Sequence, residues 1–365
     1  MTIIKELFQE YGPEYMANFK TAMPQDHLKV IHAVMNCRTS SYGIAIYECE
    51  ACGEPHLTYR SCGNRHCPGC QHQKTQLWLH KQIQRQVPGH HFMLTFTVPA
   101  HLRRFVRSHQ QIGYAAMFEA SSATIKTLAK DPKHIGGDLP GFFGVLHTWG
   151  RQLQYHPHIH YVVPGGALSR SDGKWHPSRL DFFLPVKAMS KIFKAKFRDI
   201  MRKSGVYSRV PSEVWDKGFN VNCQAVGSSY HSIKYLAPYV FKVAISNHRV
   251  IKIENRRVFF KYKKGSSSRW RTMSLNVMEF IRRFLQHVLP TGFMKIRYYG
   301  FLNPNCHVKL KKLRTLIQLS FAFTLEEEAS EECLPGPEPM VCQSCGGALK
   351  YRGSLLPSGL FISPG

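Results

Sequence analysis

The chain has 365 residues, enough for one large domain or two to three ordinary ones, and its 43% hydrophobic content is ample for a core. A formal net charge of +26 and a pI near 9.8 favour polyanions, so nucleic acid is the default partner. The sequence has no apolar run long enough for a transmembrane helix, and the start MTIIKELFQEYGPEY lacks the apolar core of a signal peptide, so we expect a cytosolic protein.

A helix and a cysteine-rich module are predicted first. Residues 21–36 have apolar side chains at helical spacing, with Pro24 in the first turn. The cysteine-rich stretch 37–70 follows, and a polar helix over 72–87 leads out of it. Eleven cysteines in a cytosolic chain indicate metal binding rather than disulfides.

Two C-x2-C pairs in this module predict a zinc site. Each pair can place two thiolates on one metal, and two pairs complete a tetrahedral sulfur shell that suits structural Zn²⁺. The predicted ligands are Cys49, Cys52, Cys67 and Cys70. The nearby Cys37, Cys62 and His66 are either ordinary residues or ligands of a second zinc, and three ligands alone would leave a structural site incomplete.

The middle of the chain mixes helices with strands that pair antiparallel, which predicts the α+β class. Strands are expected at 91–99, at 142–150 and 156–166 as a hairpin, and at 249–253 and 256–264 as a second hairpin. Helices are expected at 113–130, 185–205 and 230–246, and from a cap at Asn276 with Glu279 to Val288.

The chain changes character after about residue 315. The stretch LEEEASEECLPGPEP is acidic and proline-rich, as in a linker. Cys342 and Cys345 form half of another knuckle, whose late partners could only be Cys306, His307 or Cys333. A tail without metal is equally consistent with this pattern.

Three histidines predict a second kind of metal site. His158 and His160 are two residues apart and point to the same face of a strand, while Ile159 points into the core. His147 lies on the preceding strand of the hairpin, where antiparallel pairing brings it beside them. The alternative is a histidine-rich strand that packs against aromatic residues. We expect His156 on the other face of the strand, away from the metal.

A divalent ion on a basic protein indicates phosphate chemistry, and the candidate nucleophiles are Tyr235 and Tyr239 in YLAPY. On a helix these tyrosines share one face, although two core tyrosines would show the same spacing and Pro238 disfavours a regular helix. The segment FFKYKKGSSSRWR interleaves basic and aromatic residues, which suits DNA contact as well as it suits a solvated hairpin. Its candidate contacts are Lys261, Lys263, Lys264 and Arg269.

The order of these motifs resembles a known family. HPHIHYVV is similar to the His-hydrophobic-His (HUH) motif of rolling-circle nucleases, and CRTSSYG…CEACG…YRSCGNRHCPGCQ resembles the zinc module of transposases of insertion-sequence family ninety-one. LHTWGRQLQYHPHIH, FLPVKAMSKIFKAKF, YLAPYVFKVAIS and IRYYGF extend the resemblance to about residue 300. One departure is Ala45, where many members carry a histidine, and this weakens the case for a second zinc.

The resemblance implies a single-strand endonuclease with an HUH antiparallel sheet and flanking helices, preceded by a small zinc-ribbon-like domain. It places the metal ligands at His158 and His160, the third at His147, and the nucleophiles at Tyr235 and Tyr239. Mg²⁺ or Mn²⁺ would act there, on single-stranded DNA and hairpins at the ends of a mobile element, in the bacterial cytoplasm at the nucleoid. The expected domains are residues 1–85 (helix and zinc module), 86–305 (nuclease) and 306–365 (basic segment and acidic tail).

The same chemistry would serve a plasmid replication initiator or a relaxase, and loss of the nuclease would leave a zinc-dependent DNA-binding protein. The zinc module ahead of the nuclease and the motifs after it favour the transposase. The presence of all three histidines and both tyrosines argues against a decayed enzyme.

Overall fold

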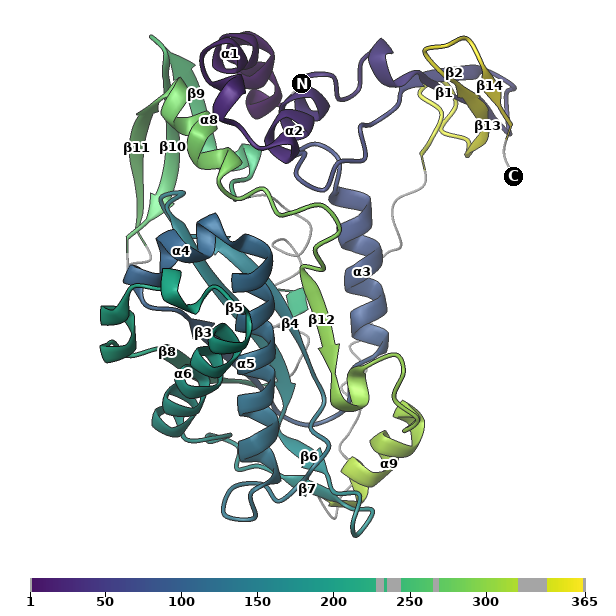
Figure 1. Ribbon diagram of the computed structural model, residues 1–365. Coiled ribbons are helices and arrows are strands. Elements are labelled where there is room, and N and C mark those ends of the chain that lie inside the picture. Colours follow the sequence, from purple (N-terminus) through teal and green to yellow (C-terminus); the bar gives the residue numbers. More distant parts are fainter. Residues whose placement is uncertain (1, 228–232, 235–243, 265–268, 321–339, 364–365) are drawn as a thin grey trace.

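The computed structural model describes residues 2–227, 233–234, 244–264, 269–320 and 340–363. They form an α+β protein with four antiparallel sheets, as the sequence predicts for the class (Figure 1). Short 3-10 turns connect several elements, at Lys20–Ala22, Ser40–Tyr42, Ala100–Leu102, Tyr207–Arg209, Ser212–Asp216, Asn247–Arg249 and Gly300–Leu302. No helix in the described part of the chain is both long and apolar enough to cross a membrane.

A five-stranded sheet in the order β12-β4-β5-β3-β8 is the centre of the fold. Its strands are β3 (His91–Thr97), β4 (Phe142–Trp149), β5 (Tyr155–Pro164), β8 (Asn220–Gly227) and β12 (Ile296–Tyr299). The hairpin predicted at the histidine motif is confirmed by the pairing of β4 with β5. The longest strand, β5, lies in the middle of the sheet, between β4 and β3.

Three helices cover one face of this sheet: α4 (Arg103–Ser108), α5 (Gln110–Lys130) and α6 (Val186–Lys203). Apolar residues at helical spacing on α6 pack against the strand residues that alternate toward this face. In the strands these include Phe96, Ile159 and Tyr161, all fully buried. The Tyr161 hydroxyl lies 2.6 Å from Ser121 Oγ on α5, so even the polar tip of this core residue is satisfied.

Part of the opposite face is covered by α3 (His72–Gln84) and α9 (Leu310–Ser320), with the small β6 (Gly166–Leu168) and β7 (Trp175–Pro177) pair beside them. Here Trp78 of α3 packs on Phe143, Val145 and Val162. These strand residues are an even number of positions from the histidines of β4 and β5, so they point to the same face of the sheet. The covering helices therefore bury one end of this face, and the histidines lie on the remainder.

A second core joins the beginning of the chain to its later part. The helices α1 (Ile3–Phe19), α2 (Gln25–Met35) and α8 (Val277–Leu285) pack with the sheet of β9 (Val250–Glu254), β10 (Arg257–Lys263) and β11 (Trp270–Asn276). The Phe8 and Phe284 rings meet edge to face at 5.1 Å. At the predicted N-cap of α8, Asn276 Oδ1 accepts the Met278 N–H at 2.9 Å, while Glu279 pairs with Arg282 and Arg283.

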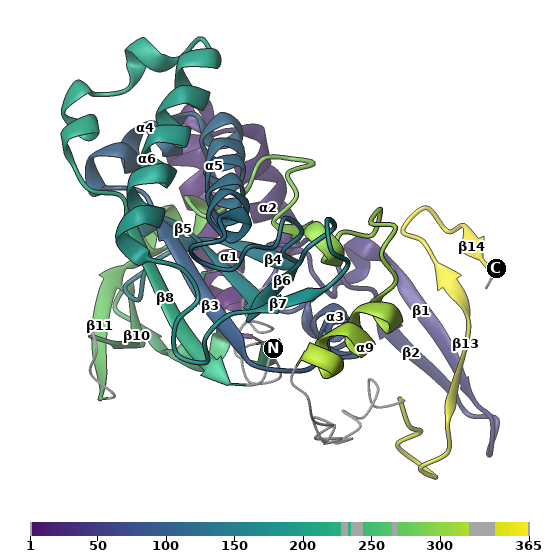
Figure 2. The ribbon, with the colours of Figure 1, turned by 90° about the horizontal axis from the view of Figure 1, so that it is seen from below.

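A small four-stranded sheet, in the order β14-β13-β1-β2, lies outside the three hydrophobic cores. Its strands are β1 (Ile44–Cys49), β2 (Pro55–Tyr59), β13 (Leu349–Leu355) and β14 (Phe361–Ile362). Figures 1 and 2 both show this sheet beside α3 and apart from the central sheet. Residues 44–59 thus meet the C-terminal strands in one sheet, which we call the terminal ribbon.

Packing crosses both expected domain boundaries. The helices α1 and α2 belong to the second core, α3 covers part of the central sheet, and β13 pairs with β1. The elements that the sequence did not predict are α1, α4, α9, β1, β2, β6, β7, β8, β11, β12, β13 and β14. Most of the helix expected at 230–246 lies outside the described residues, which include helical Ile233 and Lys234.

Candidate functional site

The three predicted histidines converge on the open part of the central sheet. His147 pairs directly with His158 across β4 and β5, and His160 pairs with Val145. One ring nitrogen from each histidine lies within 4.8 Å of the others. The structure therefore brings together the three imidazoles that the sequence assigns to one divalent ion.

Hydrogen bonds orient two of these rings. His158 Nδ1 donates to the His156 carbonyl at 2.7 Å, so Nε2 of that ring carries the lone pair. His160 Nδ1 lies 3.0 Å from Thr95 Oγ1 on β3, which leaves its Nε2 for the same task. Metal-binding histidines are commonly held in this way, with the second ring nitrogen fixed by an outer partner.

The imidazoles are neutral at pH 7. Burial lowers the pKa of His158 to about 4 and that of His160 to about 3, and it holds the pKa of His147 well below its usual value. A metal needs this neutral form of histidine. The His147 ring stacks on the Trp149 indole at 5.1 Å, and Lys295 Nζ lies 4.8 Å from the centre of that indole, so His147 has a rigid backing.

The strand face expected for His156 was wrong. Because His156 and His158 are also two residues apart, they have the same parity, and their ring centroids lie 5.1 Å apart. The strand is irregular here, since Trp149 pairs with Tyr155 and the register shifts beside His147. This bulge includes Pro157, which has no N–H to donate to a ladder. His156 lines the same cleft as the three histidines without joining their cluster.

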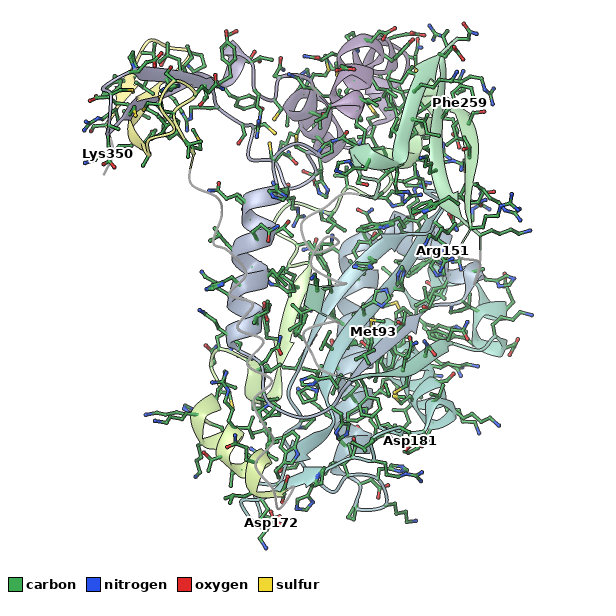
Figure 3. The ribbon with its side chains drawn as sticks, turned by 180° about the vertical axis from the view of Figure 1, so that it is seen from behind. Met93, Arg151, Asp172, Asp181, Phe259 and Lys350 are labelled. Carbon is green, nitrogen blue, oxygen red and sulfur yellow. The ribbon has the colours of Figure 1, made fainter. Side chains whose placement is uncertain are left out.

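An open cleft of about 590 Å³ lies over the histidines. Basic residues of the β4–β5 connection and of β10 complete its walls, and none of the described residues that line it is acidic. Its lining comprises His147, Trp149, Gly150, Arg151, Gln152, Gln154, His156, His158, His160, Arg249, Tyr262, Lys263 and Lys264. Figure 3 views this side of the molecule, with Met93 near the middle of the sheet and Arg151 toward β10 and β11.

The predicted DNA contacts divide between the cleft and its surroundings. Lys263 and Lys264 line the cleft, whereas Lys261 and Arg269 do not. Three further lining residues were not predicted from the sequence: Arg151 of the β4–β5 connection, and Arg249 and Tyr262, which reach the site only through tertiary packing. Arg249 donates from Nη2 to the Arg151 carbonyl at 2.7 Å and from Nε to the Lys261 carbonyl at 2.9 Å, so it ties β10 to the histidine hairpin.

The predicted nucleophiles Tyr235 and Tyr239 lie outside the described residues. Ile233, two residues before Tyr235, is buried against Phe143 and Val162 on the histidine face of the sheet. The described chain thus approaches the tyrosine motif along the same face that carries the proposed metal ligands.

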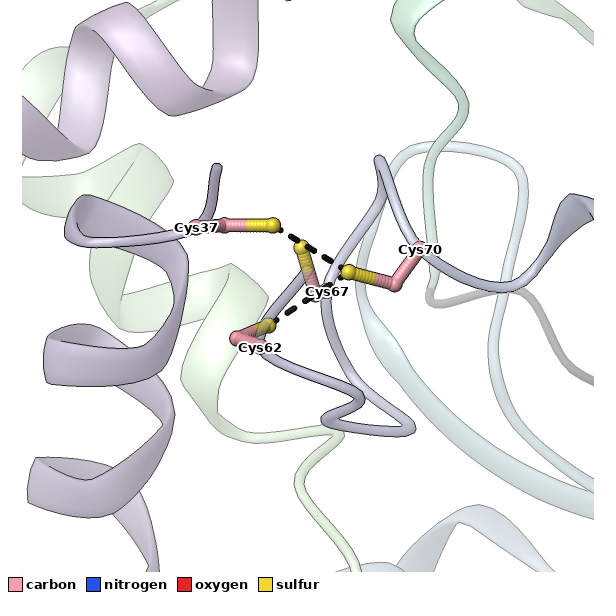
Figure 4. A group of neighbouring side chains, drawn as sticks. All are labelled: Cys37, Cys62, Cys67 and Cys70. Atoms are coloured by element: carbon pink, nitrogen blue, oxygen red, sulfur yellow. Dashed lines mark hydrogen bonds between the residues drawn. The ribbon is translucent and has the colours of Figure 1, made fainter. Parts of the chain in front are cut away.

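The structure corrects the predicted cysteine shell. Cys67 and Cys70 meet Cys37 and Cys62, not Cys49 and Cys52, in a group whose sulfurs all lie within 4.8 Å of one another (Figure 4). Cys37 Sγ lies 3.1 Å and Cys62 Sγ 3.5 Å from Cys70 Sγ. Cys49 and Cys52 instead form a group with Cys342 and Cys345. The possible ligands Cys37 and Cys62 therefore belong to a full four-cysteine group.

His66 has a structural role in place of the metal role considered for it. Its Nε2 accepts the Leu289 N–H at 3.3 Å, and burial lowers its pKa to about 3. Its neighbour Arg65 donates to the carbonyls of Pro290 at 2.7 Å and Phe293 at 2.6 Å. The cysteine loop thereby holds the segment that leads into Lys295 and β12.

Comparisons with known proteins agree with this architecture. Residues 7–98 match the family model "Transposase zinc-binding domain", and residues 141–309 match the model "Putative transposase". The chain is 33% identical over 360 residues to "Putative transposase y4qJ" of Sinorhizobium fredii, covering 90% of this chain and 87% of that protein.

The chain belongs to the transposases of insertion-sequence family ninety-one. It is also 25% identical over 359 residues to "Transposase for insertion sequence element IS801" of Pseudomonas savastanoi pv. phaseolicola, covering 92% of this chain and 85% of that protein. No solved structure matches the chain. The cysteine groups and the matching zinc-binding domain support structural Zn²⁺ in this transposase.

The hydrogen bond at His160 gives a first prediction. Thr95→Val keeps the shape of the side chain but removes the hydroxyl that fixes the ring, so Mn²⁺ affinity at the histidines should fall about 10-fold. Electron paramagnetic resonance of free Mn²⁺ during titration measures this. Thr97→Val, on the same strand and face without a hydrogen bond to a histidine ring among those described, should bind Mn²⁺ as the unchanged chain does. Equal affinities in the two variants would exclude an orienting role for Thr95.

Proposed function

We propose that this transposase nicks and rejoins single-stranded DNA through a covalent 5′-phosphotyrosine intermediate, in a rolling-circle-like transposition. The observation that carries the proposal is the convergence of three neutral imidazoles at the floor of a basic cleft. Neutral nitrogen donors that face an anion-binding cleft suit a divalent ion that acts on a phosphodiester.

His147, His158 and His160 would hold that ion, Mg²⁺ or Mn²⁺, and leave part of its coordination sphere for a phosphate oxygen. When bound, the ion would stabilise negative charge on the scissile phosphate and on the departing 3′ oxygen. The protein fixes the three rings through Thr95, the His156 carbonyl and Trp149, so the site is organised before DNA arrives.

A tyrosine would supply the nucleophile. The Tyr239 or Tyr235 phenol oxygen forms a bond to phosphorus, the bond from phosphorus to the 3′ oxygen breaks, and the 3′ end takes a proton to become a hydroxyl. The phenolic proton leaves to solvent. The covalent link conserves the phosphoester bond for the reverse reaction, in which a 3′-OH displaces the tyrosine and joins the strands.

The cleft would bind the DNA strand. Arg151, Arg249, Lys263 and Lys264 supply positive charge along its walls, and Tyr262 supplies an aromatic ring on which a base can stack. Tyr262 is also the described tyrosine of the cleft lining, so it is the natural control for the proposed nucleophiles.

The proposal predicts separate effects on cleavage and on binding. His158→Ala and His160→Ala should each lower the nicking rate by about 10³-fold, because the ion loses a ligand, while affinity for single-stranded DNA changes little. Cleavage of a labelled oligonucleotide from an element end and fluorescence anisotropy measure the two quantities. His156→Ala is the matched control and should nick at a rate near that of the unchanged chain. Full nicking activity in the His158 and His160 variants would exclude these histidines as ligands of the catalytic ion.

The tyrosines should divide the reaction. Tyr239→Phe should lose the first nick and its covalent adduct, because the sequence predicts a more regular helix after Pro238 than before it. Tyr235→Phe should nick but fail to complete strand transfer. Adducts on a labelled 5′ strand, separated on denaturing gels, report both steps, and Tyr262→Phe should form them normally. Loss of the adduct in Tyr262→Phe alone would move the nucleophile to Tyr262, and loss in none of the three would direct the search to Tyr230.

The charge of the cleft predicts salt-sensitive binding. With six or more phosphates neutralised, affinity should fall by roughly 10³-fold or more between low and moderate salt. Replacing Lys263 and Lys264 together with alanine should weaken binding and reduce the magnitude of the slope of log affinity against log salt by about 1.4 for single strands. Lys311→Ala with Lys312→Ala removes the same charge from α9 and should leave the slope unchanged. Identical slopes in both double variants would place the DNA elsewhere.

A further inference from the structure

The terminal ribbon contains two matching cysteine turns. In the N-terminal turn the Gly53 N–H donates to the Cys49 carbonyl at 2.9 Å, and in the C-terminal turn the Gly346 N–H donates to the Cys342 carbonyl, also at 2.9 Å. Both glycines adopt positive φ, +73° and +74°. A C-x2-C-G turn of this kind presents both thiols of its pair on one side, because the positive φ of the glycine folds the chain back.

The two turns face each other across about 290 residues of sequence. Cys49 Sγ lies 3.4 Å from Cys345 Sγ, and Cys52 Sγ lies 3.7 Å from Cys342 Sγ and 3.4 Å from Cys345 Sγ. Zn–S bonds of about 2.3 Å in a tetrahedron place sulfurs about 3.8 Å apart. A disulfide needs about 2.05 Å, so the spacing fits a shared metal ion and not a pair of disulfides.

The backbone at Gly347 approaches the group of four sulfurs closely. A Cβ at Gly347 would lie 2.8 Å from Ala51 Cβ and 3.0 Å from Cys49 Sγ, so a larger residue there would push into the sulfur shell. His56 has a ring nitrogen 3.2 Å from Cys342 Sγ, where an N–H can donate to a thiolate. Glu54 lies at 4.0 Å from the same sulfur, outside the shell.

The terminal ribbon has little else to hold it. None of its residues belongs to the three hydrophobic cores, and large apolar side chains on it are exposed, with Leu57 at 64% and Phe361 at 52%. Its most buried side chains include Cys49 and Cys342, at 2% and 1% exposed. Small sheets without an apolar core are ordinarily stabilised by a metal or by disulfides.

We propose that Cys49, Cys52, Cys342 and Cys345 bind a second structural Zn²⁺, separate from the Cys37, Cys62, Cys67 and Cys70 site, and that this ion ties the C-terminal strands to the N-terminal hairpin. Cys342 and Cys345 lie beyond both matched family regions, 7–98 and 141–309. Four soft thiolates in a closed shell select zinc and leave no position for water. The proposal is independent of the nicking chemistry.

Zinc content of the full chain tests the site. With His158→Ala and His160→Ala in every chain compared, so that the histidine site adds no metal, protein purified without chelator should contain about two zinc ions per chain by mass spectrometry of the metal, since each group of four thiolates completes one shell. Cys342→Ser with Cys345→Ser should contain about one, and so should Cys49→Ser with Cys52→Ser. Combining all four substitutions should still leave about one, because both pairs serve the same ion. Cys223→Ser with Cys306→Ser removes two cysteines outside both groups and should keep about two.

Two results would overturn the proposal: about one zinc in the unchanged chain, or about two in the Cys342 and Cys345 double variant. Cobalt binding to the unchanged chain guards against a variant that fails to fold, since two Co²⁺ ions should each give the spectrum of a four-sulfur tetrahedral site. His56→Ala should retain about two zinc ions, because its ring contacts a ligand from outside the shell; loss of one would make His56 a ligand and correct the shell.

Cutting the chain between the two cysteine turns tests whether the metal holds the C-terminal strands to the N-terminal hairpin. With a protease recognition sequence inserted within residues 321–339, the cleaved C-terminal fragment should stay with the rest of the protein during gel filtration. The fragment should elute separately in the Cys342 and Cys345 double variant. It should also elute separately when the protein with all its cysteines is treated with a chelator. A fragment that stays bound in the double variant would show that strand pairing holds the ribbon without the metal.

Discussion

The antiparallel pairing of β4 with β5 is the constraint on which the candidate site depends. It sets His147 opposite His158, and a slip of one residue would turn the histidines toward the covering helices. The intervening Leu146, Ile159 and Tyr161 are fully buried on the helical face and fix the register. Packing on one face of the sheet therefore determines the geometry of the three histidines on the other. The bulge at His156 and Pro157 lies just beyond the three histidines and alters the strand without moving them apart.

The group of Cys37, Cys62, Cys67 and Cys70 stabilises this arrangement indirectly, through its loop. Its loop carries Arg65 and His66, which hold residues 289–293 through backbone groups. That segment leads to Lys295, whose ammonium lies over the indole that stacks on His147. A zinc module in such a position can stabilise the histidine site without touching DNA, because ordering the loop orders the wall behind the imidazoles. Loss of metal from this group would alter the cleft through the contact of Lys295 with Trp149.

Local patterns were predictable from the sequence, and distant pairings were not. The histidine triad follows from two-residue periodicity and a short hairpin connection, both readable within twenty or so residues. The cysteine grouping failed because nearness in sequence suggested Cys67 and Cys70 as partners of Cys49 and Cys52. The glycine after Cys52 and after Cys345, absent after Cys70, is the feature that could have matched the turns. Strand β8 alternates exposed polar residues such as Asn220 and Asn222 with the half-buried Val221 and Cys223, and no local pattern specifies its pairing with β3.

Charge and neutrality work together at the cleft. Arginines and lysines crowd its walls without a lining carboxylate among the described residues, so the free protein carries repulsion that a phosphate backbone relieves. Positive charge outside the cleft lining also opposes protonation of the imidazoles: Arg103 adds to burial in lowering the pKa of His158, and Lys295 does so for His147. An acidic wall would attract a metal ion but would raise these pKa values and repel DNA. Basic walls over buried histidines would leave the nitrogen lone pairs for the proposed ion and the surface charge for the strand.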